Sequence, residues 1–247
     1  GLMSSQGRIA VVSGGMGGIG TAICKRLAAE GAIVVALAHT SEEEQVPAWQ
    51  AENGNFEVMC GDVAEQADAA RMMNAVVEKH GRVDIVVNCA GITRDTTFKK
   101  MTPEQWNAVI DVNLSSIYNV TQPVWNGMLE NGFGRVINIS SVNGQRGQFG
   151  QANYSAAKAG MHGFSMALAY EGAAKGVTAN TVSPGYIETA MTAAMRDDVR
   201  EAIVSGIPMR RMGTPEEIAG AVAFLAADDA TYITGANLPV NGGLFIH

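Results

Sequence analysis

The sequence has few cysteines, few basic residues and no long apolar run, and each shortage excludes a class of protein. Cys24, Cys60 and Cys89 are odd in number and lack metal-ligand spacing, so we expect reduced thiols in a cytoplasmic protein. Lys and Arg total 17 against 24 Asp and Glu, and the net charge of -7 offers no basic footprint for nucleic acid. No apolar run could span a bilayer and no signal peptide is indicated, so we expect no membrane partner. The four histidines form no ligand cluster, so we expect no metal.

What the sequence does have is a regular alternation of short apolar runs with helix-like stretches. The apolar, β-branched runs occupy residues 8–13, 32–38, 56–62, 83–91, 134–141 and 177–185. Strands that are apolar on both faces and alternate with helices predict a parallel sheet covered on both sides. "TPEQ" at 102–105 and "TPEE" at 214–217 predict two helix starts, each with a Thr cap and a Pro in the first turn.

The same alternation continues without a linker, a repeat or a low-complexity tract. We therefore expect a single α/β domain over residues 1–247. Gly1 and Leu2 stand before Met3, and we expect them to be a remnant outside that domain.

A glycine-rich loop, "SGGMGGIG", occupies residues 13–20, directly between the first predicted strand and the first predicted helix. Glycines there let the backbone turn tightly and approach a pyrophosphate, which the positive end of the helix attracts. The alternative is a flexible glycine turn without a ligand, and a lone glycine pattern is weak evidence. The position of the loop at the first strand–helix turn favours a dinucleotide site.

Tyr154 and Lys158, in "YSAAK", are spaced so that they share one face of a helix. An ammonium group beside the phenol favours its anion and so lowers the pKa of the Tyr154 hydroxyl. The pair would then act as a proton donor tuned for work near neutral pH. The alternative is an ordinary helix surface, which is the more common reading of a lone pair of this kind.

Taken together, the motifs make the sequence resemble the short-chain dehydrogenase/reductase family along its whole length. They occur in the family's order: "SGGMGGIG", "GD" at 61–62, "NCAG" at 88–91, Asn113 in "DVNL", Ser141 in "NISS", "YSAAK" and "PGYIET" at 184–189. "NCAG" departs from the usual "NNAG" at Cys89, and because that motif is mostly structural we expect little effect on activity. The resemblance implies a Rossmann fold, a doubly wound parallel sheet of about seven strands with helices on both faces.

The resemblance also implies catalytic roles for Asn113, Ser141, Tyr154 and Lys158. Ser141 would bind the substrate carbonyl oxygen, and Tyr154 would donate a proton to that oxygen as hydride reaches the carbon. Lys158 would lower the pKa of Tyr154 and hold the nicotinamide ribose, while Asn113 would fix a water that links Lys158 to solvent. The implied cofactor-binding residues are Gly14, Gly17, Gly18, Ile19, Gly20, His39, Thr40, Asp62, Val63, Asn88, Ala90, Gly91, Pro184, Gly185, Ile187 and Thr189, together with Tyr154 and Lys158.

The loop after the second predicted strand bears on the choice between NADH and NADPH. A site for the 2′-phosphate of NADPH needs Arg or Lys, and none occurs between Arg26 and Arg71. An acid at the strand end for the ribose hydroxyls is missing as well, while His39 and Thr40 could still hydrogen-bond a phosphate. The choice stays open, with the balance towards NADH.

Within the family, "NISSVNGQRGQFGQANYSAAKAG" at 138–160 resembles bacterial members that reduce acetoacetyl-CoA for polyhydroxybutyrate synthesis. That resemblance implies that the acetoacetyl group is surrounded by Gln148, Phe149, Gln151 and Tyr186. Residues 192–203 would form a mobile helical lid. Candidates for binding the CoA phosphates are Arg94, Lys99 and Lys100. The alternative is that these three residues form a solvated basic patch without a ligand. The family is commonly tetrameric, so we expect a homotetramer that takes a small-molecule acyl-CoA.

Three other functions compete with this one. A 3-oxoacyl-acyl-carrier-protein reductase performs the same chemistry, but that group usually docks its acidic carrier on an arginine where this chain has Tyr170. A non-catalytic dinucleotide sensor would not need Ser141, Tyr154 and Lys158 together. A sugar or steroid alcohol dehydrogenase is disfavoured by the short-chain pocket residues.

Overall fold

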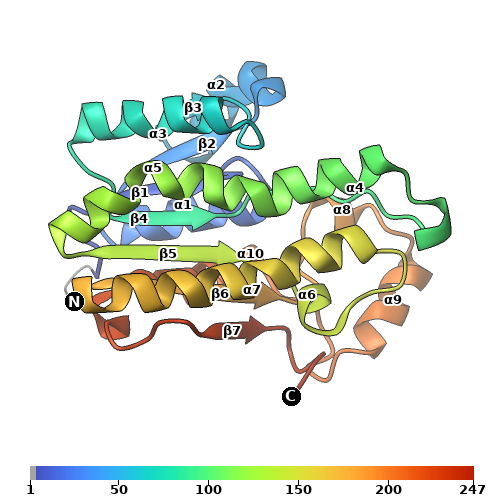
Figure 1. Cartoon of the computed structure of the whole chain (residues 1–247). Coiled ribbons are helices and arrows are strands. Elements are labelled where there is room, and N and C mark those ends of the chain that lie inside the picture. The colour runs from blue at the N-terminus through green and yellow to red at the C-terminus, as the bar shows by residue number, and fades with distance from the viewer. Residues whose placement is uncertain (1–3) are drawn as a thin grey trace.

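The computed structural model describes residues 4–247, and within them seven strands form one parallel sheet (Figure 1). The expectation for Gly1 and Leu2 lies outside the described residues. The strands run in the order β3-β2-β1-β4-β5-β6-β7. Their bounds are β1 Ile9–Ser13, β2 Ile33–Ala38, β3 Glu57–Cys60, β4 Ile85–Asn88, β5 Gly134–Ile139, β6 Val177–Pro184 and β7 Asn237–Val240. The order reverses between β1 and β4, so the predicted doubly wound sheet is confirmed.

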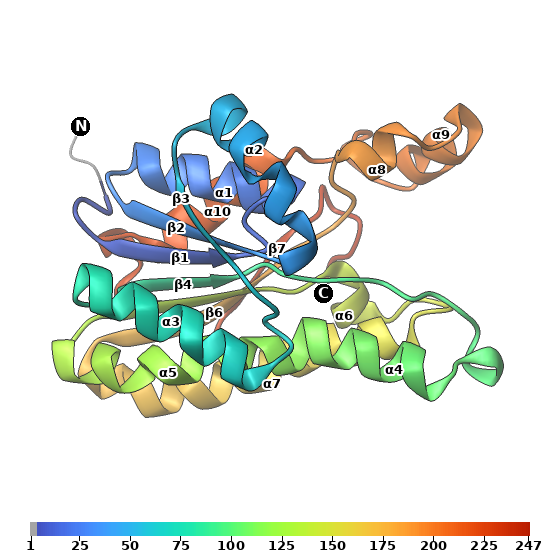
Figure 2. The same cartoon turned by 90° about the horizontal axis from the view of Figure 1, so that it is seen from above.

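Helices cover both faces of the sheet, as expected. Their bounds are α1 Gly18–Ala29, α2 Val46–Asn53, α3 Gln66–His80, α4 Pro103–Ile110, α5 Ser116–Asn131, α6 Val142–Arg146, α7 Ala152–Gly172, α8 Ala190–Ala193, α9 Asp197–Ser205 and α10 Pro215–Ala226. Seen from above, α3, α5 and α7 lie on one face of the sheet, and α1 and α10 lie on the other (Figure 2). Across residues 4–247, no helix combines the length and the apolarity that crossing a bilayer requires.

Two hydrophobic cores, one on each face, explain why the strands are apolar throughout. Successive residues of β1 alternate between them: Ala10 and Val12 pack with residues of α1 and α10, while Ile9 and Val11 pack with residues of α3 and α5. Because side chains alternate across a strand, a strand between two helix layers needs an apolar residue at every position. This is the pattern that the sequence shows.

Both predicted helix starts are confirmed in the structure. The Thr102 hydroxyl accepts a hydrogen bond from the Gln105 amide at the start of α4, and the Thr214 hydroxyl accepts one from the Glu217 amide at the start of α10. Each glutamine or glutamate side chain accepts a hydrogen bond in return from the threonine amide, which completes a capping box.

Residues 188–212 leave the sheet after β6 as one excursion that carries α8 and α9. The two helices project beyond the carboxyl ends of the strands (Figure 2). At the base, the Glu188 amide donates to the Gly213 carbonyl at 2.8 Å, and the Gly213 amide donates to the Tyr186 carbonyl at 2.9 Å. These two bonds make a neck through which the excursion leaves and returns.

The segment 192–203, predicted as a mobile helical lid, includes parts of two helices. α8 ends at Ala193 and α9 begins at Asp197. Asp197 and Asp198 lie in the first turn of α9, where the helix dipole favours negative charge, so a new helix start is preferred there.

Candidate active site

The predicted site residues come from several segments, and most lie where strands end at one edge of the sheet. The glycine loop follows β1, Asn88 ends β4, Ser141 follows β5 and Pro184 ends β6. Because all strands are parallel, these ends lie along one edge, beside the reversal between β1 and β4. Open α/β sheets bind their ligands at such a reversal.

The glycine loop is packed so closely that Gly14, Gly15 and Gly20 have no room for a side chain. Gly14 has a φ of +61°, and a Cβ there would lie 2.8 Å from the backbone of Ala90. A Cβ at Gly20 would overlap the Gly14 carbonyl oxygen. Gly14 and Gly20 hold the loop against the start of α1 and the end of β4.

The start of α1 fits an anionic group. Gly17 is the cap residue and no side chain caps the helix, which has no acidic residue in its first turn. Uncapped amides at a helix start bind phosphate, so the residues present fit the pyrophosphate of a dinucleotide. The Thr189 methyl group would lie 3.5 Å from a Cβ at Gly18, so the loop after β6 borders the same place.

The segments predicted to hold the adenosine side of a dinucleotide follow β2 and β3. His39 caps the turn after β2, and its Nδ1 lies 3.1 Å from the Ser41 amide nitrogen and 2.8 Å from Ser41 Oγ. Glu42 accepts a hydrogen bond from the His39 amide at 3.0 Å. A cleft of about 500 Å³ lies beside them, lined by Met16, Ser41, Glu42, Gln45, Ala48, Trp49 and Glu52. Two carboxylates and no basic side chain line this cleft.

The remaining predicted cofactor residues are placed mostly through backbone and packing. Asp62 accepts a hydrogen bond from the Ala64 amide at 3.0 Å, which fixes the turn after β3. Asn88 is buried and donates to Asn138 Oδ1 at 2.8 Å and to Thr121 Oγ1 at 3.1 Å, so its amide is used inside the sheet. Thr40 begins a 3₁₀ turn, Thr40–Gln45. Residues held mainly by backbone or apolar contacts are Ile19, Val63, Ala90, Gly91, Pro184, Gly185 and Ile187.

Ser141, Tyr154 and Lys158 meet at the end of β5 and the start of α7. Ser141 caps α6, and its Oγ accepts a hydrogen bond from the Asn143 amide at 3.0 Å, which leaves its own hydrogen free to donate elsewhere. Lys158 is buried and its Nζ donates to the Ile139 carbonyl at 2.8 Å. The same Nζ lies 5.4 Å from the centre of the Tyr154 ring. The predicted catalytic side chains are therefore neighbours.

Burial shifts the pKa of two members of this group. Burial lowers the pKa of Lys158 to about 8. Burial also raises the pKa of Tyr154; the Ser141 hydroxyl opposes that rise, while Cys89 and Asp95 add to it. Burial therefore acts against the predicted lowering of the Tyr154 pKa, and that role of Lys158 stays a prediction for the protein with its cofactor bound.

Asn113 lies in a single turn of π-helix, Asp111–Ser115, between α4 and α5. Its Nδ2 donates to the Ile92 carbonyl at 2.8 Å and to the Val109 carbonyl at 2.9 Å. Its buried Oδ1 accepts no hydrogen bond from the residues described. A Cβ on Gly91 would lie 2.7 Å from this oxygen and 3.6 Å from Lys158 Nζ, so both atoms face the same space. A free acceptor beside a lysine suits an ordered water.

The four predicted acyl-binding residues differ in their exposure and in their hydrogen-bond partners. Gln148 and Phe149 are exposed, with 87% of Phe149 accessible. Gln151 is buried, and its amide is engaged by other side chains: it accepts from Asn143 Nδ2 at 3.0 Å and donates to both oxygens of Asp95 at 3.1 Å. Sequence reasoning missed Asp95, because no spacing rule connects a loop residue after β4 with the start of α7.

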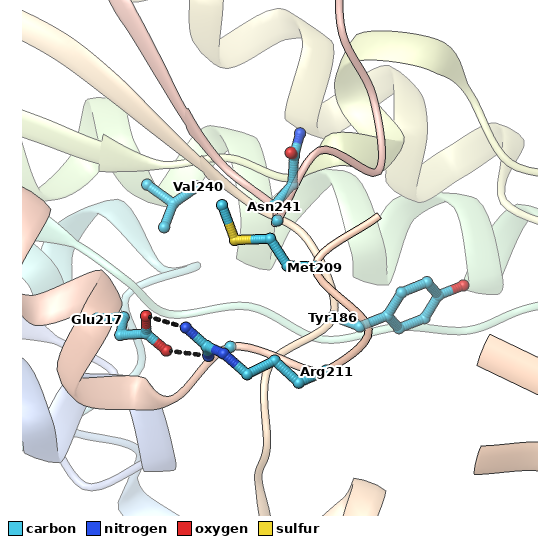
Figure 3. Close-up of a pocket in the computed structure, with 8 residues that line it drawn as sticks. Tyr186, Met209, Arg211, Glu217, Val240 and Asn241 are labelled. Carbon is cyan, nitrogen blue, oxygen red and sulfur yellow. Dashed lines mark hydrogen bonds and ion pairs between the residues drawn. The ribbon is translucent and has the colours of Figure 1, made fainter. Parts of the chain in front are cut away.

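Tyr186 lies at the neck of the excursion. It borders a cavity of about 40 Å³, and Figure 3 shows its ring pointing away from that cavity. On the opposite wall, Arg211 and Glu217 form a two-pronged ion pair, with N···O distances of 2.6 and 2.8 Å. The cavity is small and separate from Ser141 and Tyr154, since neither residue lines it.

The three basic residues proposed for CoA phosphates lie on the segment after β4. Arg94 donates to the neighbouring Thr93 carbonyl at 2.7 Å, while Lys99 and Lys100 lie on one turn of 3₁₀-helix, Phe98–Lys100. All three are exposed, and none forms an ion pair with another residue of the described chain. Among residues 4–247, no three His, Cys, Asp or Glu side chains gather as they would around a metal ion.

Two hydroxyl groups, Ser141 and Tyr154, beside a buried ammonium can polarise a carbonyl group and give it a proton. Nothing in this set can supply a hydride, and the glycine loop next to it fits a dinucleotide.

Comparisons with known proteins agree with this geometry. Residues 14–245 match the family model described as "Enoyl-(Acyl carrier protein) reductase". The chain is 66% identical to an acetoacetyl-CoA reductase of Allochromatium vinosum over 97% of this chain and 99% of that protein. It is 53% identical to an acetoacetyl-CoA reductase of Cupriavidus necator, over 96% and 98% of the two chains. It is 46% identical to a 3-oxoacyl-acyl-carrier-protein reductase of Escherichia coli, over 99% and 100%.

Proposed function

The chain belongs to the short-chain dehydrogenase/reductase family, and we propose that it reduces acetoacetyl-CoA to (R)-3-hydroxybutyryl-CoA for polyhydroxybutyrate synthesis. Membership of the family implies a nicotinamide cofactor. The observation that carries the proposal is the meeting of Ser141, Tyr154 and Lys158 beside the uncapped start of α1. The similarity to acetoacetyl-CoA reductases gives the substrate.

The bound dihydronicotinamide supplies the hydride that reaches the carbonyl carbon. Ser141 donates a hydrogen bond to the carbonyl oxygen, since its lone pairs already accept from the Asn143 amide. Tyr154 donates its proton to the same oxygen, and a raised pKa keeps that proton on the phenol at neutral pH. Lys158, with a pKa of about 8, and the free Oδ1 of Asn113 then provide a route by which Tyr154 regains a proton.

A matrix of two cofactors and two substrates tests the proposal. NADH and NADPH are each assayed with acetoacetyl-CoA and with a longer 3-oxoacyl-CoA, and consumption of the reduced nicotinamide is followed by absorbance. We expect turnover with acetoacetyl-CoA and a much lower kcat/KM with the longer chain. Equal use of both chain lengths would contradict the proposed substrate.

A 3-oxoacyl-acyl-carrier-protein reductase is the second candidate, because the chain is 46% identical to one from Escherichia coli. The higher identity to acetoacetyl-CoA reductases favours the CoA thioester. Tyr170, at 90% exposure, gives α7 an apolar aromatic surface where a carrier would need a cation. Assay of acetoacetyl-CoA against acetoacetyl-acyl-carrier protein separates the two candidates.

For the cofactor we propose a preference for NADH. The cleft between the glycine loop and the turn after β2 is lined by Glu42 and Glu52 and by no basic residue. His39 Nδ1 lies against Ser41, so the Nε2 side of the ring is the side that could approach a phosphate. A 2′-phosphate would meet like charge here without a cation to pair with.

We propose that one domain, residues 4–247, assembles as a homotetramer in the cytoplasm. A single sheet runs through the whole described chain, and its three cysteines are free. α5 and α7 cover the same face of the sheet (Figure 2) and expose Tyr118 (50%), Met166 (48%) and Tyr170 (90%), which would suit burial between subunits. Light scattering after gel filtration should give four times the chain mass; a monomer mass would contradict the assembly.

A further inference from the structure

The side of α7 that faces the sheet carries polar side chains at three successive contact positions. Lys158 Nζ donates to the Ile139 carbonyl at 2.8 Å. Ser165 Oγ accepts from Asn138 Nδ2 at 2.8 Å. His162 lies between them, four residues after Lys158 and three before Ser165, so all three share one face of the helix. Catalysis as proposed uses Lys158 but gives His162 no role.

The imidazole of His162 contacts a hydroxyl group on each of its two nitrogen atoms. Its Nε2 lies 3.2 Å from Ser140 Oγ, and its Nδ1 lies 2.9 Å from Thr181 Oγ1. Ser140 follows β5, Thr181 lies in β6, and both residues are buried. One side chain of α7 therefore bridges two neighbouring strands.

Counting hydrogen atoms gives the direction of these contacts. The Ser140 hydroxyl donates its one hydrogen to the Lys158 carbonyl at 2.8 Å, so its oxygen accepts from His162 Nε2–H. Burial lowers the pKa of His162, so the ring is neutral at pH 7 and its Nδ1 is an acceptor for the Thr181 hydroxyl. The Thr181 hydroxyl has a second acceptor within reach, Asn237 Oδ1 at 2.9 Å.

The Ser140 hydroxyl stands between two of the predicted catalytic residues. Ser140 directly precedes Ser141 in the chain, and it is bonded to the backbone of Lys158. A Cβ on Gly144 would lie 2.8 Å from the Lys158 carbonyl carbon, and Gly144 belongs to α6, the short helix that Ser141 caps. Ser141 and Lys158 are thus joined by one compact set of contacts, and His162 Nε2 reaches that set from the next turn of α7.

We propose that His162 is a positioning residue that acts through Ser140. Its Nε2–H holds the Ser140 hydroxyl in the orientation that binds the Lys158 carbonyl, and so fixes Ser141 relative to the first turns of α7. Reaction rates depend steeply on such placement, and in this role the imidazole needs no contact with substrate or cofactor. The inference rests on the proposed function only for the reaction by which it is assayed.

Three substitutions of His162 separate its two contacts. The amide nitrogen of a glutamine can take the place of Nε2, so His162→Gln keeps a donor for Ser140. The shorter His162→Asn keeps an acceptor for Thr181, and His162→Leu keeps neither. In His162→Leu the two hydroxyls retain the Lys158 carbonyl and Asn237 Oδ1 as acceptors, so neither donor is left unpaired and the protein should fold.

The assay compares kcat for acetoacetyl-CoA with the Kd of the reduced nicotinamide cofactor, which is followed by its fluorescence. We expect His162→Leu and His162→Asn to lower kcat by about tenfold or more, and His162→Gln to keep kcat within about threefold of the wild type. The Kd should change much less than kcat, because the glycine loop lies outside these contacts.

Ser165→Ala is the matched control, because it removes another polar contact between the same face of α7 and β5. It leaves the buried Asn138 amide without its partner, so it should lower the melting temperature while kcat stays within about twofold. A loss of kcat in Ser165→Ala as large as that in His162→Leu would show a general loosening of the helix and overturn the inference. So would a His162→Gln enzyme that is no faster than His162→Asn.

Nitrogen NMR of the imidazole rings tests the hydrogen-bond pattern without substrate or cofactor. The signals of His162 are those that disappear in His162→Gln. The neutral ring should carry its proton on Nε2, and Ser140→Ala should shift the Nε2 signal; a proton on Nδ1 would overturn the inference. If His162→Leu fails to fold, the comparison of His162→Gln with His162→Asn decides. A wild type inactive on acetoacetyl-CoA would contradict the proposed function, and the NMR result would still decide the role of His162.

Discussion

Replacing Lys158 by methionine should stabilise the protein near neutral pH while abolishing its activity. Lys158 is 3% exposed, and burial lowers its pKa from 10.5 to about 8. The folded state thus binds the lysine proton more weakly than the unfolded chain does. Below pH 8 the ammonium is charged in both states and its desolvation opposes folding in full. Methionine has a similar length and needs no proton.

The size of the effect follows from the shift in pKa. One pKa unit corresponds to about 1.4 kcal/mol, so the shift from 10.5 to about 8 makes the ammonium cost about 3 kcal/mol of folding free energy. The lost hydrogen bond from Nζ to the Ile139 carbonyl offsets about 1 kcal/mol of the gain. Lys158→Met should therefore gain about 2 kcal/mol at pH 7.

The sign of the pH dependence makes the prediction specific. Between about pH 8 and 10.5 the folded protein releases the proton while the unfolded chain still holds it, so the wild type gains stability as pH rises. The advantage of Lys158→Met should shrink over that interval. Urea unfolding at pH 7 and at pH 9.5, at one protein concentration, measures it, with Lys175→Met as an exposed control. A variant no more stable than the wild type at pH 7, or a gap that does not change with pH, would refute the reasoning.

Three further predictions test the site. Tyr154→Phe should lower turnover of acetoacetyl-CoA by at least about 100-fold while cofactor binding, followed by nicotinamide fluorescence, persists; Tyr170→Phe, on the exposed side of the same helix, is the control. Gly14→Ala, where a Cβ would lie 2.8 Å from neighbouring backbone at a φ of +61°, should cost about 2 kcal/mol in thermal or urea unfolding. At Gly17 a Cβ would lie 3.4 Å from the Gly14 carbonyl oxygen, so Gly17→Ala should lower the free energy of unfolding by less than about 1 kcal/mol. Thr40→Arg should raise the ratio of kcat/KM for NADPH over NADH by about tenfold, and an unchanged ratio would count against the proposed cofactor loop.

The backbone of this protein could be predicted from its sequence because the signals are local. A strand between two helix layers is apolar at every position, as in β1, and Thr102 and Thr214 carry their capping partners three residues ahead. Such patterns depend on neighbours in sequence, which can be read directly. The break between α8 and α9 was not part of the prediction, although two acidic residues, Asp197 and Asp198, favour a helix start there.

Side-chain roles that depend on distant partners could not be predicted in the same way. Gln151 has an amide suited to a thioester, and only the fold shows that Asp95 and Asn143 already occupy it. The spacing of Tyr154 and Lys158 predicts their proximity but not their burial, which raises the pKa of Tyr154 and lowers that of Lys158. Burial of an ionisable group is set by the whole packed structure.

The neck beneath α8 and α9 has a consequence for how relatives of this chain can be altered. The chain leaves the sheet at Tyr186 and returns at Gly213, and hydrogen bonds join these two points. Changing the length of the loop between them therefore changes the entropy cost of closing that loop only a little. Their length and composition can change while the hydrophobic cores stay as they are. The excursion can therefore be exchanged between two relatives by joining the chains at these two residues. The exchange should transfer any acyl-chain selectivity that the excursion confers. Proton transfer at Tyr154 should remain that of the recipient protein.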